Sequence, residues 1–144
     1  MVSSLYLWLK INNFYRLMFH GGGIPMSALI EKLKEFGCSE EDLSRAVERF
    51  LNNDAFYERC FTKYLADASF KSLGEALKTN NVADIFNHAH TLKGVTANMG
   101  ITPVYDEVCI IVEAVRDSSI VPEGLDVHYQ NIMGYHEKLQ KMVG

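Results

Sequence analysis

One stretch of the sequence brings together side chains that could take part in phosphoryl transfer: residues 86–100, FNHAHTLKGVTANMG. Apolar or small residues recur along it at spacings of three and four, the pattern of a helix with one side facing a core. The members of this stripe are Ile85, Ala89, Leu92, Thr96 and Met99. His90 lies roughly 100° around the helix from Ala89. Its neighbours on its own side are Phe86 before it and Lys93 and Gly94 after it.

These residue types suit a phosphoryl acceptor. A neutral imidazole such as that of His90 can accept a phosphoryl group on a ring nitrogen. The ammonium group of Lys93, one turn further on, can neutralise the transferring oxygens. Gly94 costs a helix about 1 kcal/mol relative to Ala, so its presence suggests that another group must come close. A partner protein that approaches His90 would be such a group.

The run His90-Thr91-Leu92-Lys93-Gly94, with Gly100 closing the stretch, resembles the signature of histidine-containing phosphotransfer (HPt) domains. The resemblance implies an antiparallel four-helix bundle over most of residues 26–144. His90 would be the exposed phosphoacceptor, Lys93 would assist the phosphoryl group, and Gly94 would leave room for a docking receiver domain. Ala97 and Asn98 follow on the same side and complete the expected docking surface. Gly100 is interpreted only as a helix stop in the left-handed conformation.

The resemblance also implies a role in a two-component phosphorelay. His90 would carry a phosphoryl group between aspartates of response-regulator receiver domains, including those of hybrid sensor kinases. The sequence shows no glycine-rich phosphate loop and is too short for an added kinase domain, so we expect no ATP-dependent kinase activity. We expect no cofactor or metal on this chain, and Mg²⁺ supplied by the partner receiver domain.

Two other classes of function stay open. The first is a non-catalytic helical interaction module that docks or sequesters receiver domains without phosphate turnover. The second is a ligand-binding bundle, which would need a sizeable internal cavity lined by polar groups.

Composition agrees with a single helical domain. The chain has 144 residues, 48% hydrophobic and 22% charged, with only three prolines and no alternating runs of Val and Ile, so we predict an all-α fold. A formal net charge of -4 argues against nucleic acid as a partner. The three cysteines, Cys38, Cys60 and Cys109, are odd in number and widely spaced, which indicates free thiols in a reducing compartment and hence a cytoplasmic protein.

The flanking helices are predicted from their periodicity and caps. Helices are expected from Ser27 to Gly37, then over 40–50 after a Ser39–Asp42 cap, and over 55–66 after a cap at residues 52–54. The helices over 55–66 and 68–79 could form a bent antiparallel pair or one broken helix. Asn81, with Asp84 three residues on, begins the His90 helix.

The last two helices are predicted from prolines that follow a cap or a turn. Thr102 and Pro103 are expected to open the first of them as N-cap and N1 residues, and Pro122 is expected to open the final helix.

Residues 1–25 differ from the rest, with five aromatic residues and no acidic one. They are a poor signal peptide and too interrupted by polar residues for a membrane span. Three interpretations compete: a non-native start with Met26 as the natural one, an accessory helix that docks on the bundle, and a membrane-surface anchor. The last fits least well, because the polar face is not rich in Lys or Arg. We therefore divide the chain into an N-terminal extension, 1–25, and an HPt-like helical domain, 26–144.

The remaining histidines and acidic residues show no site pattern. His88 is two residues from His90, so the two side chains point apart and His88 is expected at the solvated surface. His20, His128 and His136 have no partner that spacing reveals. The acidic residues of the following helix are expected to form a solvated face: Asp106, Glu107 and Glu113.

Overall fold

The computed structural model describes residues 26–143, and within this range the chain is helical with no strand. The helices are α2 (Met26–Phe36), α3 (Glu40–Arg49), α4 (Asp54–Leu65), α5 (Ser69–Lys78), α6 (Val82–Met99), α7 (Thr102–Val115) and α8 (Leu125–Val143). The all-α prediction is confirmed. The three interpretations of residues 1–25 concern residues outside the described range.

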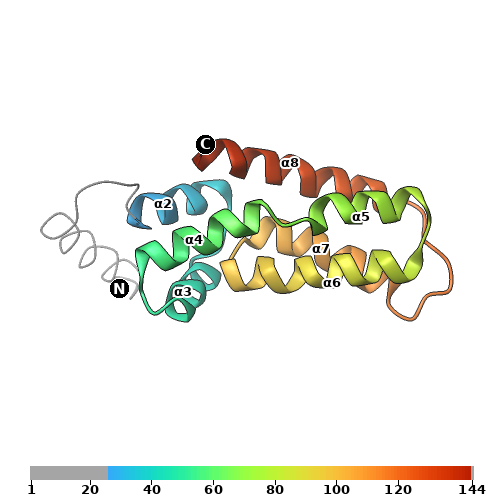
Figure 1. Ribbon diagram of the computed structural model, residues 1–144, viewed down its shortest axis with the longest axis horizontal. Helices are drawn as coiled ribbons and strands as arrows, with labels where there is room; N and C mark the ends of the chain where they lie inside the picture. The colour runs from blue at the N-terminus through green and yellow to red at the C-terminus, as the bar shows by residue number, and fades with distance from the viewer. Residues whose placement is uncertain (1–25, 144) are drawn as a thin grey trace, which may run out of the picture.

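The long helices form an antiparallel four-helix bundle (Figure 1). Helix α6 packs against α5 and α7, and α8 packs against α7 and α5. Helices α4 and α5 follow one another along the long axis of the molecule, so the alternative of one broken helix is the one observed (Figure 1). The short helices α2 and α3 lie at one end, where α3 contacts α6 and α2 contacts α4. The predicted bundle with extra short N-terminal helices is confirmed.

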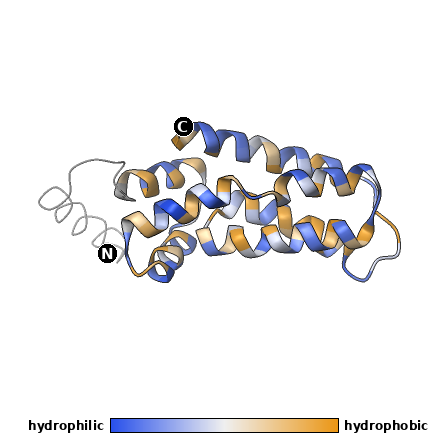
Figure 2. Ribbon diagram, viewed as in Figure 1, coloured by the Kyte–Doolittle hydropathy of each residue, from blue (hydrophilic) through white to orange (hydrophobic). Residues whose placement is uncertain are grey.

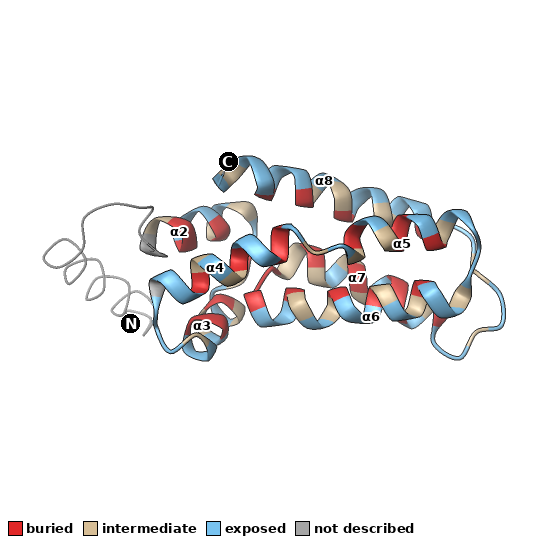
Figure 3. Ribbon diagram, viewed as in Figure 1, coloured by how far each residue is buried: buried red, intermediate tan, exposed pale blue. Residues whose placement is uncertain are grey.

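The core runs the length of the bundle between the apolar faces of its helices (Figures 2 and 3). All five residues of the stripe predicted for the His90 helix are buried: Ile85, Ala89, Leu92, Thr96 and Met99. Fully burying one large apolar side chain contributes about 1.5–3 kcal/mol. The stripe therefore fixes the rotation of α6 about its axis and decides which of its side chains face solvent.

The three predicted local caps are present. The side-chain oxygens of Ser39, Asn53 and Asn81 accept hydrogen bonds from backbone N–H groups three residues on, at 3.1 Å, 3.0 Å and 3.1 Å. Each bond satisfies one of the free N–H groups at a helix start. These caps define where α3, α4 and α6 begin.

Two predicted helix starts were wrong in detail. Thr102 is the first residue of α7, not its cap, and Ile101 occupies the cap position without a side-chain hydrogen bond. The Thr102 hydroxyl instead accepts from Ser39 N at 2.9 Å and donates to Asp42 Oδ2 at 2.7 Å, joining the starts of α7 and α3. Pro122 lies in the connection before α8, which begins at Leu125.

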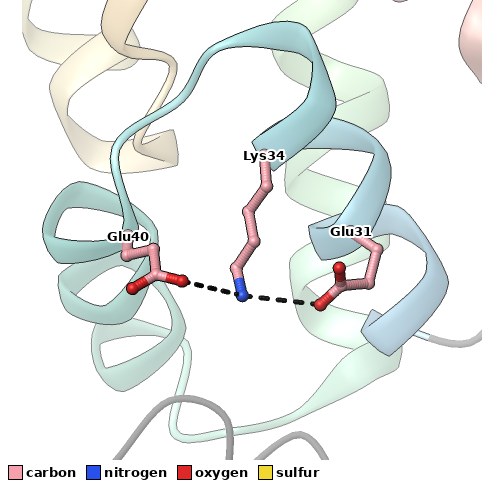
Figure 4. A network of polar contacts seen from close by, with 3 residues as sticks. All are labelled: Glu31, Lys34 and Glu40. Atoms are coloured by element: carbon pink, nitrogen blue, oxygen red, sulfur yellow. Dashed lines mark hydrogen bonds and ion pairs between the residues drawn. The ribbon is translucent and has the colours of Figure 1, made fainter. Parts of the chain in front are cut away.

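Helices α2 and α3 are also joined by a bridging lysine (Figure 4). Lys34 Nζ lies 3.4 Å from Glu31 Oε1 on its own helix and 3.3 Å from Glu40 Oε1 at the start of α3. The Lys34 side chain is only 18% exposed, whereas both carboxylates are open to solvent. Such partly solvated pairs orient helices more than they stabilise them.

Gly100 has a second role besides ending α6. Its backbone is left-handed, with φ 75°, as predicted for a helix stop. In addition, a Cβ added there would lie 2.8 Å from the carbonyl oxygen of Asp42 in α3. The end of the His90 helix and the backbone of α3 therefore approach one another through a position that only glycine fits.

We expect Gly100→Ala to lower the free energy of unfolding by about 1–3 kcal/mol, because it combines a left-handed alanine with a clash against backbone. Gly134→Ala is the matched control, since a Cβ at Gly134 in α8 meets nothing within 4 Å. That control should leave stability unchanged or slightly raised. Urea unfolding followed by circular dichroism measures both variants, and equal midpoints for the two would contradict the close approach at Gly100.

His136, for which the sequence showed no partner, is a core residue with 4% exposure. Its ring stacks on Phe70 at a centroid distance of 3.8 Å and meets the edge of Tyr64 at 6.3 Å. Burial lowers the pKa of His136, and the Leu65 backbone opposes this only in part. Burial therefore favours the neutral form of the imidazole.

This burial makes stability depend on pH in a defined direction. The unfolded chain binds a proton at His136 with a pKa of about 6.5, and the folded chain binds it only at lower pH. The contribution of His136 to the free energy of unfolding is fully present above about pH 6.5. It is lost as the pH falls toward the pKa of the folded chain. We expect His136→Phe to weaken the fall in melting temperature as the pH drops below about 6.5. Melting temperatures of both proteins between pH 7.5 and 5 test it, and parallel curves would contradict it.

Candidate functional site

The predicted site residues lie along one side of α6. His90, Gly94, Ala97 and Asn98 are exposed, and Lys93 is half-buried. Their spacing places them in adjacent rows along the helix, opposite the buried stripe. The structure thus brings together all five residues that the sequence singled out.

The His90 ring is held by packing, not by hydrogen bonds. It stacks on Phe86 with ring centroids 5.5 Å apart and an interplanar angle of 13°. The guanidinium carbon of Arg116, from the end of α7, lies 5.7 Å from the centroid of the same Phe86 ring. Across residues 26–143, no group hydrogen-bonds to the His90 ring nitrogens, so both edges of the imidazole are available to an incoming group.

Lys93 and Gly94 give the site its charge and its access. Within the described range the Lys93 ammonium forms no ion pair, so its charge is not already neutralised by a carboxylate. A Cβ added at Gly94 would meet nothing within 4 Å. A side chain at this position would therefore not contact another described helix of the bundle. Gly94 leaves a low point on the surface beside His90.

Residues from other helices hold the C-terminal end of α6, and the sequence analysis missed them. Arg49 Nη1 of α3 donates to the carbonyl oxygens of Ala97 at 3.0 Å and Asn98 at 3.3 Å. Tyr57 of α4 donates its buried hydroxyl to the carbonyl of Met99 at 3.0 Å. The last carbonyls of a helix lack internal partners and carry partial negative charge, which suits a cation. One feature of the sequence indicates that this cation comes from another helix: the last turn of α6 contains no basic residue.

Asn98 takes part through its backbone. Its carbonyl accepts from Arg49, whereas its side chain forms no hydrogen bond with any residue in the described range. The side chain is exposed and free to contact a partner. Ala97 shares the Arg49 contact and is likewise exposed.

Two surface hollows flank His90 along α6. One, of about 460 Å³, lies toward the start of the helix and is lined by Phe86, Asn87, Arg116 and neighbouring residues. The other, of about 150 Å³, lies at the end of the helix and is lined by Arg49, Ala97 and residues of α3 and α7. His90 and Gly94 lie between them along α6, and both are exposed.

Other expectations were corrected. His88 is half-buried and not fully solvated. Glu107 does not belong to a solvated face, because its carboxylate lies 2.7 Å from His128 Nδ1 and accepts from Asn131 at 3.2 Å. Asp106 and Glu113 are exposed as predicted, and Glu113 also pairs with Arg116 at 3.1 Å. The partners of Glu107 come from α8, a later helix, so helical spacing alone could not reveal them.

The cysteines are free in the structure. Cys38 is buried, and this burial raises the pKa of its thiol to about 12. Cys60 and Cys109 are half-buried. Among residues 26–143, no group of three or more His, Cys, Asp or Glu side chains is arranged to hold a metal ion. The same part of the chain contains no helix that is long and apolar enough to cross a membrane.

Comparison with known protein families identifies the family to which the chain belongs. The Hpt domain family matches residues 65–141, more than half of the sequence, and this range contains α5, α6, α7 and nearly all of α8. The protein belongs to the HPt domain family, whose members are phosphotransfer modules of two-component signalling. Searches of curated proteins and of solved structures found no match. Helices α2 and α3 and most of α4 lie outside the matched range.

Proposed function

We propose that this protein carries a phosphoryl group on His90 between the aspartates of receiver domains in a two-component phosphorelay. The observation that supports it most directly is the exposed His90 imidazole on the central helix of an HPt domain, whose ring nitrogens form no hydrogen bond with any residue in 26–143. Lys93 and the open Gly94 position lie one turn away. Receiver domains of response regulators and of hybrid sensor kinases are the partners.

In the proposed forward step, a lone pair on one His90 ring nitrogen attacks the phosphorus of a receiver aspartyl phosphate in line. The N–P bond forms as the bond from phosphorus to the carboxylate oxygen breaks, and the aspartate leaves with that electron pair. The proton on the other ring nitrogen is retained or released to water. Transfer onward reverses these events toward the aspartate of a second receiver. Mg²⁺ held by the receiver would neutralise phosphoryl oxygens, and this chain supplies the acceptor and one cation.

Phosphate uptake by the unmodified chain tests this proposal. The protein is incubated with a phosphorylated receiver domain and Mg²⁺, and label on the chain is assayed for the acid lability and alkaline stability of a phosphoramidate. Peptide mapping at alkaline pH should place the label on the peptide that contains His90. Tight receiver binding without any label would instead support the non-catalytic docking module.

Lys93→Ala should slow transfer roughly 10-fold, because an ammonium beside the acceptor that forms no ion pair within the described part of the chain stabilises charge that develops on the phosphoryl oxygens. Receiver affinity should change little. Lys78→Ala is the control, since Lys78 is an exposed lysine in the last turn of α5. Single-turnover transfer at several receiver concentrations separates rate from affinity. A loss seen only in affinity would assign Lys93 to docking, not to charge stabilisation.

A further inference from the structure

We propose that Phe86 and Arg116 are positioning residues that hold the His90 imidazole in the orientation used for phosphoryl transfer. The inference rests on the proposed function and extends it to residues outside the run from His90 to Gly94. It is carried by a column of contacts in which Arg116 lies over Phe86 and Phe86 stacks on His90.

The need for such support follows from the exposure of His90. A solvated histidine samples three staggered χ1 wells and a broad, roughly twofold χ2, which gives about six orientations. No described residue hydrogen-bonds to the ring and selects one of them. The Phe86 ring, one turn earlier on α6, restricts this freedom because it lies nearly parallel to the imidazole at 5.5 Å.

Stacking is a suitable restraint for a phosphoryl acceptor. It occupies a face of the imidazole, whereas the lone pair of one nitrogen and the N–H of the other lie in the ring plane and stay open. Phenylalanine has no hydrogen-bonding group, so it does not compete for the attacking nitrogen. A polar partner in the same place would hold the ring at the cost of blocking one nitrogen.

Arg116 connects this restraint to a second helix. Its guanidinium lies over the Phe86 ring, in the geometry of a cation–π contact, and is itself held by Glu113 through two hydrogen bonds of 3.2 Å and 3.1 Å. Phe86 is thereby packed between its own helix and the end of α7. The orientation of His90 then depends on the position of α7 relative to α6.

The chain offers a matched control. Phe56 of α4 has the guanidinium of Arg59 at 5.9 Å from its ring centroid, and it packs against Phe50 at 5.1 Å. The Phe56 pair is of the same kind but involves no histidine. Substitutions at Phe56 and Arg59 therefore report the general effect of removing a surface cation–π pair.

The test compares Phe86→Leu, Phe86→Tyr and Arg116→Gln with Phe56→Leu and Arg59→Gln in the full chain. At saturating phosphorylated receiver, Phe86→Leu should lower the transfer rate roughly 3- to 6-fold, the gain expected from selecting one of about six orientations. Arg116→Gln should have a smaller effect in the same direction, and Phe86→Tyr should retain the rate. Because Phe86 also lines a surface hollow, a change only in the receiver concentration needed for half-maximal rate would overturn the positioning role.

A second readout does not depend on phosphorylation. In NMR spectra, the His90 ring protons should move downfield in Phe86→Leu, as the ring current of Phe86 is removed, and should stay in place in Phe86→Tyr and in both control variants. Unchanged His90 shifts in Phe86→Leu would overturn the inference. If the unmodified chain accepts no phosphate, the proposed function fails, and these shifts alone decide whether Phe86 fixes the imidazole.

Discussion

Replacement of His90 by glutamine should abolish phosphate uptake and leave the fold intact. Glutamine keeps a polar side chain of similar length with good helix propensity, and His90 is exposed, so no core contact is lost. Its amide nitrogen has no lone pair available to attack phosphorus. Acid-labile label on the variant should fall to background after incubation with a phosphorylated receiver domain.

His88→Gln is the matched control, on the same helix and two residues away. His88 lies on a different side of α6 from Lys93 and Gly94, and no hydrogen bond joins it to another described residue. It should take up label at the rate of the unmodified chain. Melting temperatures of both variants show whether the fold is kept. Label that persists on the His90 variant would refute the assignment of the phosphoacceptor.

Gly94→Gln should slow phosphotransfer without lowering the stability of the fold. The position opens to solvent, with nothing within 4 Å of an added Cβ, so a longer side chain meets no other part of the described fold. Glutamine has better helix propensity than glycine, and the melting temperature should be unchanged or raised. The same side chain projects beside His90 into the space that the receiver would enter under the proposed function. A displacement of about 1 Å at a reacting centre can cost roughly 100-fold in rate, and we expect a loss of that size.

Gly94→Ala is the control for the size of the added side chain. A single methyl group obstructs little, and removal of a helix-weakening glycine should stabilise the protein by about 0.5–1 kcal/mol. Both variants are measured by thermal melting and by single-turnover transfer on one preparation. Normal transfer by a stable Gly94→Gln protein would place the docking surface elsewhere, and a large drop in its melting temperature would mean that the glycine serves packing.

Much of the fold follows from interactions between residues close in sequence. The caps at Ser39, Asn53 and Asn81 join residues three apart, and each was predictable because the partner lies within the first turn of the same helix. The buried stripe of α6 follows from helical periodicity. That stripe also set the exposed side, so the relation of His90 to Lys93 could be predicted before any contact was known.

The tertiary structure decided the contacts that join distant segments. Arg49 donates to the backbone of Ala97, 48 residues away, and Tyr57 donates to that of Met99, 42 residues away. Periodicity predicts that a side chain is buried or exposed, but not which other helix it meets. The same reason explains why the Thr102 hydroxyl was expected to cap α7 and instead joins α7 to α3.

The difference between what the sequence determines and what the tertiary structure determines is clearest at the site itself. The sequence by itself determined how the His90 imidazole, the Lys93 ammonium and Gly94 lie relative to one another, because all three are fixed by positions on one helix. Only the tertiary structure placed Arg116 over Phe86 and left Gly94 facing open space. Those features depend on how α7 and α3 pack around α6, and packing is set by the combined burial of all the helices, which local spacing does not encode.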